Sequence, residues 1–350
     1  MLQKVRIVGS GLIGTSIALG LVQQGVSVDM VDSDLSAQAL ARDLIGGAAV
    51  IDPELVILAV PPSSLAQVIS NEIAINPHST FMDVGSVKND VVLEVESVLA
   101  LSARFVPTHP MAGREIGGAG AARADLFQGR SWILTPELDC RADSKKLVLD
   151  LITSLGATAI ELSAADHDAA VARISHLPQI AASLVAKQLL GTPAGWMELA
   201  GQGLRDTTRI AASDEQLWKE IIFSNRGEIS ELLTNLHNDL TQMIAALADP
   251  AAIAELLTAG RAGKALIPGK HGGTAREYSY LPIVIDDKPG QLGAIFNECA
   301  AMQVNVEDLN IEHSPGQLSA LITLALSLPD AAKLSAHLSS IGWNVHPVRK

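Results

Sequence analysis

The chain has 350 residues, which is more than one domain normally holds, and 48% of them are hydrophobic, enough to bury at least two cores. Its 25 basic and 38 acidic side chains give a formal net charge of −13, which would repel a phosphate backbone. Nucleic acid is therefore not an expected partner.

The cysteine content and the apolar runs indicate a cytoplasmic protein. Cys140 and Cys299 lie far apart in the sequence, so neither a disulfide framework nor a zinc-ligand spacing can form, and no metal is expected. The first residues lead straight into a strand-like run without the pattern of a signal peptide. The longest apolar runs, such as ALITLALSLP, are too short to span a bilayer, so no membrane partner is expected.

A glycine-rich turn follows the first strand-like run in VRIVGSGLIGTSIALGLVQQG. The order of strand, Gly9-x-Gly11-x-x-Gly14 and helix is the one that dinucleotide binding requires. Gly9 permits the tight turn, Gly11 lets the backbone approach the pyrophosphate, and Gly14 lets helix and strand pack closely. At the start of the helix, Leu12 and Ile13 would offer backbone N–H groups to the phosphates.

A second strand-like run, VSVDMVDSD, places Asp32 close to the offset of about 20 residues at which an acidic side chain meets the adenosine ribose. Without a nucleotide, Asp32 would simply begin the next turn. A carboxylate at this position accepts hydrogen bonds from ribose hydroxyls and repels a 2′-phosphate. The sequence therefore predicts NAD rather than NADP as the cofactor.

Strands and helices alternate through the rest of the first domain. Strand-like runs at ELVILAVPP, TFMDVGS, RFVPTHP, SWILTP and ATAIELS alternate with helical patterns at 63–69, 87–99 and 144–155. This alternation predicts an α/β fold with a Rossmann-like doubly wound sheet over residues 1–163. Ligands of such sheets bind beyond the carboxyl ends of strands, where Pro61, Ser86 and His109 fall. We expect Pro61 to contact the cofactor and His109 to lie near it, although a histidine beside a proline can also just end a strand.

Residues 164–260 have long helical periodicity and almost no strand signal, which predicts an all-helical second domain. It contains His176 in RISHLPQIAASLVA, and Arg209 and Trp218 in GLRDTTRIAASDEQLWKEIIFSN. Taken singly, His176 reads as a packed helix residue, Arg209 as a surface partner of Asp206, and Trp218 as a core anchor.

The remaining residues predict a linker and a third domain. GRAGKALIPGKHGGTAREY is glycine-rich and basic, and it predicts a linker over residues 261–277. Residues 278–350 parse as strand, helix, two strands, helix and strand, which is a βαββαβ order. Small domains of this kind serve many functions, so the pattern alone assigns none.

Taken together, these motifs resemble the prephenate dehydrogenases of the tyrosine pathway, fused to a C-terminal ACT domain. The most specific pieces are DVGSVK, PTHPMAGRE, SHLP and RDTTRIAASDEQLW, which follow the GSGLIG loop in the family's order. The turn DDKPGQLGAIF with NVEDLNIEH is typical of ACT domains. The resemblance covers essentially the full length, and it implies NAD-dependent oxidative decarboxylation of prephenate to 4-hydroxyphenylpyruvate.

The resemblance also assigns roles to residues. It implies that His109 is the catalytic histidine and that Ser86 helps to orient it. His176, Arg209 and Trp218 would lie on the substrate side, with Arg209 gripping a carboxylate through its planar donor fork. A neutral imidazole suits the chemistry, because its unperturbed pKa of roughly 6.5 lets it accept a proton at neutral pH.

One position departs from the family pattern. After HPMAG many members have threonine or serine, whereas this chain has Arg114, followed by Glu115. Arg114 would attract a substrate carboxylate or pair with Glu115. Prephenate ends in a keto acid and arogenate in an amino acid, so arogenate dehydrogenase is the alternative function.

Two further alternatives come from other groups of proteins. A β-hydroxyacid dehydrogenase would carry a lysine in the motif G-x-x-G-x-G-x-x-x-K, which this sequence lacks. An amino-acid-sensing ACT protein with an inert nucleotide domain would not need the intact glycine loop, Asp32 and His109.

The resemblance finally implies partners other than the small-molecule substrate. Members of the family pair through the helical domain, so we expect a homodimer. An ACT domain without a catalytic group suggests control by tyrosine. The expected contacts are Gly290, Gln291 and Leu292, where a helix start would offer backbone N–H groups to a carboxylate.

Overall fold

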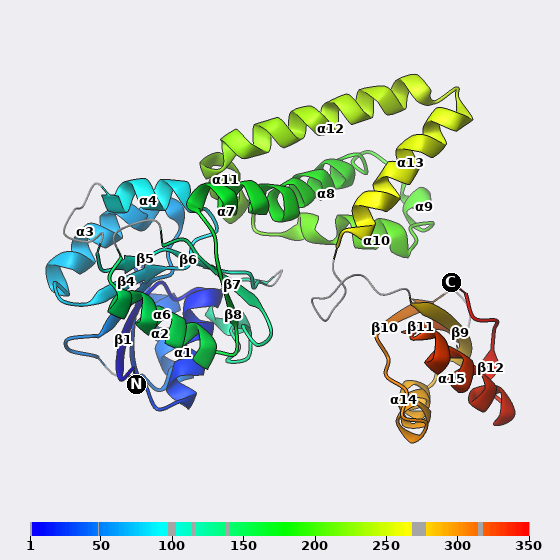
Figure 1. Cartoon of the computed structure of the whole chain (residues 1–350), viewed down its shortest axis with the longest axis horizontal. Coiled ribbons are helices and arrows are strands. Elements are labelled where there is room, and N and C mark those ends of the chain that lie inside the picture. The colour runs from blue at the N-terminus through cyan, green and yellow to red at the C-terminus, as the bar shows by residue number, and fades with distance from the viewer. Residues whose placement is uncertain are drawn as a thin grey trace. The chain divides into compact units, whose positions relative to one another are not determined.

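The computed structural model describes residues 2–47, 49–96, 103–113, 116–136, 140–267, 278–313 and 318–349 (Figure 1). The chain divides into two compact units, residues 1–238 and 239–350. The boundary between them lies within one long helix, α12 (Arg226–Ala246). No helix in the described part of the chain has the length and apolar character needed to cross a membrane.

A five-stranded parallel sheet forms the first part of the N-terminal unit, in the order β2-β1-β3-β4-β5. Its strands are β1 (Lys4–Val8), β2 (Ser27–Val31), β3 (Leu55–Leu58), β4 (Thr80–Asp83) and β5 (Phe105–Val106). The strand order reverses between β1 and β3, and ligands of such sheets bind beyond the carboxyl ends of the strands at this point. The predicted doubly wound fold is confirmed.

Helices cover both faces of this sheet, because successive strand residues point to opposite faces and both sets are apolar. Ile7 belongs to the core on one face and Val8 to the core on the other. The first core packs against α1 (Leu12–Gln23), α2 (Leu35–Ile45) and α6 (Ala142–Ser154). The second packs against α3 (Leu65–Ile75) and α4 (Asn89–Glu96).

A second, three-stranded sheet contains β6 (Thr108–Pro110), β7 (Ser131–Leu134) and β8 (Thr158–Glu161). The interpretation of RFVPTHP, SWILTP and ATAIELS as further strands of the doubly wound sheet was wrong, because only the Phe105–Val106 part belongs to it. Pro107 has no N–H to continue a ladder and separates β5 from β6. His109 therefore lies in β6, opposite Ile133 of the antiparallel strand β7.

Residues 164–265 form helices and short connections, which confirms the predicted all-helical part. Its elements are α7 (Ala164–Val171), a π-helical turn (Ala172–His176), α8 (Leu177–Lys187), α9 (Ala194–Met197), α10 (Gln202–Thr208), the 3₁₀ turn η4 (Arg209–Ala212), α11 (Glu215–Ser224), α12 and α13 (Pro250–Ala265). The linker was predicted to begin at residue 261, but residues 261–265 belong to α13. Alanine, arginine and lysine favour a helix enough there to outweigh Gly263, which costs about 1 kcal/mol. Residues 268–277 lie outside the described part.

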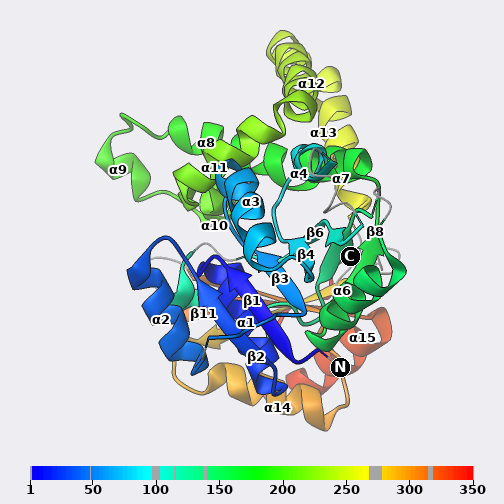
Figure 2. The ribbon, with the colours of Figure 1, turned by 90° about the vertical axis from the view of Figure 1, so that its left-hand side faces the viewer.

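The helical part of the first unit contacts the loops that follow β3 and β4. Glu220 of α11 accepts hydrogen bonds from the N–H and the hydroxyl of Ser63, at 3.3 and 2.9 Å. Ser63 belongs to the 3₁₀ turn η1 (Pro62–Ser64), which follows β3. Figures 1 and 2 show α7 beside α4, and the two helices are in contact. Residues of α7 and α11 therefore lie close to the carboxyl ends of the strands.

The second unit contains a four-stranded antiparallel sheet in the order β10-β11-β9-β12. Its elements are β9 (Ser279–Asp286), α14 (Gln291–Ala301), β10 (Asp308–His313), β11 (Ser319–Leu326), α15 (Leu328–Ser340) and β12 (Asn344–Val345). Ile283 and Ile322 of the sheet pack with Ile295 of α14 and Leu334 of α15 in one core. The predicted βαββαβ order is confirmed.

Candidate active site

The glycine loop joins β1 to α1 at the point where the strand order reverses. Gly9 has a φ of +112°, and a Cβ there would lie 2.1 Å from the carbonyl oxygen of Ala59, which follows β3. A Cβ on Gly14 would lie 2.1 Å from the carbonyl oxygen of Gly9. A Cβ on Gly11 would meet nothing within 4 Å. Only glycine fits at the first and last positions, whereas Gly11 leaves open space beside the loop.

The start of α1 fits the pyrophosphate of a dinucleotide. Gly11 is the N-cap residue, and no side chain caps the helix, so the N–H groups of Leu12 and Ile13 remain available. The buried hydroxyls of Ser10 and Thr15 also have no hydrogen-bond partner in the described part of the chain. Because a helix N-terminus attracts anions, these residues would hold the phosphates of a bound dinucleotide.

Asp32 is held at the position expected for a ribose ligand. It directly follows β2, and its Oδ2 accepts a hydrogen bond from the N–H of Ser10 at 2.6 Å. Its Oδ1 accepts from the N–H of Asp34 at 2.9 Å. Each carboxylate oxygen can accept more than one hydrogen bond, so Asp32 retains capacity for ribose hydroxyls. Pro61 is exposed and follows β3 at the same edge of the sheet.

His109 contacts a second histidine from the helical part. The Nδ1 atom of His109 lies 2.9 Å from Nε2 of His167, which belongs to α7. The Nδ1 atom of His167 lies 2.7 Å from Oδ1 of Asp168. His109 is half-buried, whereas His167 and Asp168 are at most 1% exposed.

The surroundings of His109 keep its imidazole neutral. Burial lowers the pKa of His109 well below its ordinary value of 6.5, and the nearby His167, Lys88 and His176 lower it further. At neutral pH the side chain is therefore uncharged. An uncharged imidazole can accept a proton, which is the property required of a general base.

Lys88 fixes β6 from inside the protein. Its side chain is fully buried, forms an ion pair with Asp83 of β4, and donates a hydrogen bond to the carbonyl oxygen of Thr108 at 2.8 Å. Burial lowers the pKa of Lys88, against the opposing effect of Asp83. The N–H of Thr108 donates to Asp83 at 3.0 Å, and the indole of Trp132 donates to the Thr108 hydroxyl at 2.9 Å. The residue before His109 is thus bonded to Asp83, Lys88 and Trp132.

His176 lies at the end of the π-helical turn and is 1% exposed. The amide nitrogen of Asn225 lies 3.1 Å from Nδ1 of His176 and donates to the carbonyl oxygen of Asp168 at 2.9 Å. Burial lowers the pKa of His176 to about 4, so this ring is neutral at pH 7. Trp218 meets it edge-to-face, with the ring centroids 6.0 Å apart. The structure therefore brings His176 and Trp218 together.

Arg209 is exposed and begins the turn η4. The next residue, Ile210, accepts a hydrogen bond through its carbonyl oxygen from the side chain of Gln179 at 2.9 Å. Gln179 belongs to α8, which directly follows His176. Arg209 is thus held on the segment that packs against the helix of His176.

Sequence reasoning missed His167, Asp168 and Lys88. His167 and Asp168 stand in SAADHDAAV, and Lys88 ends DVGSVK. A His-Asp pair is a usable signal, but His167 is 58 positions from His109, and no local pattern brings the two together. Ser86 is half-buried, and within the described residues no hydrogen bond joins it to His109. Arg114 lies outside the described residues.

The doubly wound sheet, the glycine loop and Asp32 are those of a dinucleotide-dependent oxidoreductase. Among the described residues, no cluster of histidine, cysteine and acidic side chains could hold a metal. The family model of the prephenate dehydrogenase nucleotide-binding domain matches residues 17–161, and that of the prephenate dehydrogenase dimerization domain matches residues 163–258. The chain belongs to the prephenate dehydrogenase family and is an NAD-dependent dehydrogenase, which confirms the resemblance to the prephenate dehydrogenases.

Individual relatives resemble the chain over most of their length. A Streptomyces niveus protein named probable prephenate dehydrogenase NovF is 30% identical, with 96% of this chain and 98% of the relative covered. The structure of Aquifex aeolicus prephenate dehydrogenase in complex with hydroxyphenyl propionate and NAD+ is 27% identical with a TM-score of 0.66, and covers 75% of this chain and 98% of that one. Synechocystis arogenate dehydrogenase is 25% identical with a TM-score of 0.62, and covers 75% and 99%.

Gly11 faces open space and Gly14 faces the backbone, so replacement by alanine should affect the two positions differently. In Gly11→Ala the methyl group enters open space, so the protein should fold normally while the KM for NAD rises roughly tenfold or more. In Gly14→Ala the methyl group meets the Gly9 carbonyl, which should lower the free energy of unfolding by about 1 to 3 kcal/mol. Thermal unfolding without NAD, together with NAD kinetics, checks both. Equal losses of Tm in the two variants would contradict the assignment of Gly11 to cofactor contact.

Proposed function

We propose that the protein catalyses the NAD-dependent oxidative decarboxylation of prephenate to 4-hydroxyphenylpyruvate, with His109 as the base. The proposal rests on two features of His109. Its imidazole is neutral, and it lies in β6, the strand that directly follows the nucleotide-binding sheet in the chain. The backbone of the preceding residue, Thr108, is fixed through Lys88 and Asp83, which suits a neighbouring group that must meet a bound substrate at a defined position.

The reaction requires little chemistry from the protein beyond this base. Prephenate carries a hydroxyl group on the ring carbon that loses hydride, and loss of carbon dioxide makes the ring aromatic. When bound, NAD accepts the hydride. As that carbon becomes a carbonyl carbon, His109 takes the hydroxyl proton. The bond to the leaving carboxylate then supplies the electron pair that completes the aromatic ring, and the oxygen, now a phenolate, takes the proton back from His109 to give the phenol and the neutral imidazole.

The helical part would orient the substrate. We assign Arg209 to a substrate carboxylate, because a guanidinium can hold both carboxylate oxygens at once. His176 and Trp218, which pack together near the start of α8, would line the same side. Arg114 remains a candidate for the substrate's side-chain end, and Ser86 remains a candidate for helping to orient His109. Arogenate is the alternative substrate, since it differs from prephenate only at the side-chain end.

We further propose a preference for NAD over NADP and a cytoplasmic location. The carboxylate of Asp32, fixed by two backbone N–H groups, would repel a 2′-phosphate. The two cysteines, Cys140 and Cys299, are free thiols, which suits a reducing compartment.

Replacing His109 tests the proposed chemistry. His109→Asn should lower kcat by a factor of roughly 100 or more with little change in the KM for NAD, because a general base is lost. In the wild type the base must be neutral, so kcat/KM should fall only as the pH drops through the lowered pKa, well below 6.5. Reduced-cofactor absorbance with prephenate or arogenate measures both. An active His109→Asn variant would reduce His109 to a residue that ends a strand.

Arg209→Ala serves as the matched comparison. It should chiefly raise the KM for the carboxylate substrate, because it removes a binding contact and leaves the base intact. An unchanged KM would assign Arg209 to a structural contact.

The enzyme, as we propose it, is a homodimer that pairs through its helical part. Leu236, Leu240 and Ile244 recur every four residues on α12, and they are 38, 57 and 62% exposed. Apolar side chains at this spacing share one helix face, and an exposed apolar face of this kind marks an interaction site. The family model that matches residues 163–258 is described as a dimerization domain, which supports the same proposal.

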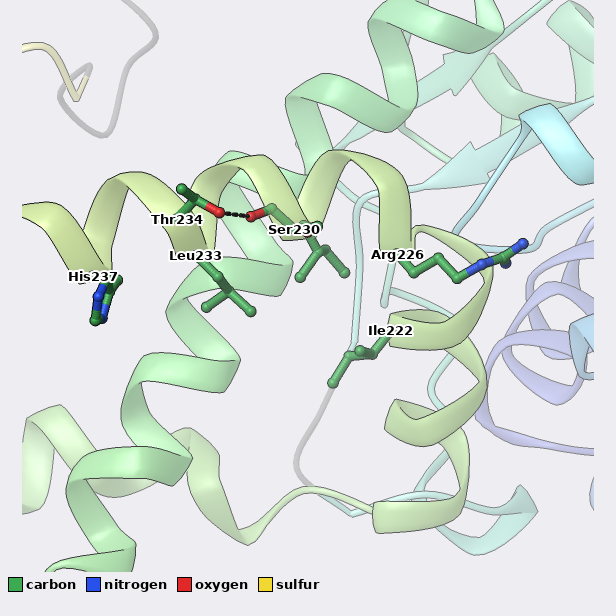
Figure 3. A pocket seen from close by; sticks show the side chains of 7 residues that line it. Ile222, Arg226, Ser230, Leu233, Thr234 and His237 are labelled. Atoms are coloured by element: carbon green, nitrogen blue, oxygen red, sulfur yellow. Dashed lines mark hydrogen bonds between the residues drawn. The ribbon is translucent and has the colours of Figure 1, made fainter.

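A hollow lies on α11 and the first half of α12 (Figure 3). Its volume is about 420 Å³, and its lining combines apolar and polar side chains: Ile222, Arg226, Ile229, Ser230, Leu233, Thr234 and His237. None of the residues assigned to the chemistry lines it. We therefore assign the hollow to subunit contact and not to the substrate.

Light scattering at micromolar concentration should give twice the chain mass of 36.7 kDa. Leu240→Asp should shift the protein toward a monomer, because it places a charge in an apolar contact. Asn238→Asp, two residues away and on another side of α12, should remain dimeric. A wild-type monomer, or equal behaviour of the two variants, would contradict pairing through this face.

We also propose that tyrosine controls the enzyme through residues 278–350. Gly290 has a φ of +90° and begins α14, which no side chain caps. The backbone N–H of Leu292 could therefore donate to an amino-acid carboxylate, and that of Gln291, which donates to the carbonyl oxygen of Lys288 at 3.4 Å, would have to change partner to do so. These residues contribute nothing to the chemistry, so a regulatory role explains their presence on the chain. Inhibition requires that tyrosine bind the less active conformation more tightly.

Truncation after Gly273 tests this control. Tyrosine should inhibit the full chain more strongly than the truncated one, by a factor of roughly 5 to 100, which corresponds to typical coupling between sites. Without tyrosine, equal kcat/KM values for the two forms serve as the control for folding. Equal inhibition of both forms would mean that tyrosine competes at the active site.

A further inference from the structure

Asp168, His167 and His109 form a continuous hydrogen-bonded chain from α7 to β6. Oδ1 of Asp168 lies 2.7 Å from Nδ1 of His167, and Nε2 of His167 lies 2.9 Å from Nδ1 of His109. Neither His167 nor Asp168 is more than 1% exposed, so water does not compete for these bonds. The proposed function uses His109 alone and gives the other two residues no role.

Backbone groups fix Asp168 as the acceptor at one end of this chain. Oδ1 of Asp168 accepts from the N–H of Lys88 at 2.8 Å, and Oδ2 accepts from the N–H of Asn89 at 2.9 Å. A backbone N–H can only donate, so the Asp168 carboxyl acts as an acceptor on both oxygens. His167 must then carry its proton on Nδ1, where it faces Asp168.

The same reasoning extends to His109. In its neutral form His167 has one N–H and one acceptor nitrogen, so with the proton on Nδ1 its Nε2 is an acceptor. Nδ1 of His109 must therefore carry the proton that forms the 2.9 Å bond. Because His109 has only one ring proton when neutral, its Nε2 holds the free lone pair.

We propose that His167 and Asp168 are positioning residues that hold His109 in the tautomer with a proton on Nδ1, so that Nε2 faces the substrate as the proton acceptor. This proposal rests on the proposed function of His109. The pair would also stabilise the imidazolium that forms when His109 takes the hydroxyl proton, because His167 accepts from its Nδ1–H and Asp168 supplies a compensating charge.

Asp168 also has a structural role that must be separated from this one. It caps the first N–H groups of α4 and accepts from Asn225 through its carbonyl oxygen, so replacing it would disturb the fold as well as the tautomer. Replacing His167 allows the two roles to be tested separately, because one of its ring nitrogens faces Asp168 and the other faces His109.

Two amide replacements of His167 form a matched pair. The amide of His167→Gln reaches about as far as Nε2 and keeps an acceptor for His109, but it cannot bond Asp168 as Nδ1 does. The shorter amide of His167→Asn replaces Nδ1, keeps a bond to Asp168 and leaves His109 without a partner. A positioning role predicts a loss of kcat of tenfold or less for His167→Gln and of roughly 100-fold for His167→Asn, with KM values little changed. The reverse order would show that His167 serves only to support Asp168 and would overturn the proposal.

The tautomer itself is measured without substrate. In protein labelled with ¹⁵N-histidine, NMR distinguishes a protonated ring nitrogen from one with a free lone pair, and the spectrum of His109→Asn assigns the His109 signals. We expect the wild type to show a proton on Nδ1 of His109, and His167→Asn to show a shift toward Nε2. A wild-type proton on Nε2 would overturn the proposal even if His109→Asn confirms that His109 is the base. Conversely, the Nδ1–H tautomer in a protein whose His109→Asn variant stays active would refute the proposed function and leave the tautomer assignment standing.

Discussion

The carboxylate of Asp168 joins the two halves of the active site. It is 1% exposed, yet it accepts hydrogen bonds from two backbone N–H groups after β4 and contacts His167 on its own helix. A buried carboxylate is costly unless such donors surround it, and the positive end of α4 adds to their effect. Because the donors come from the nucleotide-binding part and the carboxylate from the helical part, their positions are coupled. The geometry around His109 depends on this coupling.

Lys88 provides the complementary support from within the sheet. Its ammonium group, fully buried, bonds Asp83 and the carbonyl oxygen of Thr108, so the residue next to His109 is held by β4. Breaking a buried pair of this kind is far more damaging than its net stabilisation suggests, because one charge is left without a partner. Lys88 therefore acts on the reaction through the position of β6, and its charge also lowers the pKa of His109.

Local patterns predicted most of the fold, but they predicted only part of the site. Glycine spacing and strand–helix alternation are local, and they correctly indicated the doubly wound sheet, the helical part and the βαββαβ order. Two local details were predicted wrongly, because opposing preferences compete there. Pro107 ends a strand that its apolar neighbours would continue, and the helix-favouring neighbours of Gly263 extend α13 to Ala265. His167 meets His109 only because the helical part folds back on the sheet, and no spacing in the sequence encodes that contact. His176 and Trp218 were read singly as packing residues, and their contact with each other fits that reading as well as a substrate-side role.

The low pKa of His109 in the free protein is compatible with its proposed role as the base. Aromatisation makes the proposed reaction strongly downhill, so the base need not hold the proton tightly, and a weakly basic imidazole returns to its neutral form easily. Burial lowers its pKa, and the nearby His167, Lys88 and His176 lower it further. A bound substrate with carboxylate groups brings negative charge toward the same ring, and negative charge favours the imidazolium. His109 would thus be neutral in the free protein and become more basic when the substrate binds. Its pKa would then be highest in the complex in which the proton is transferred.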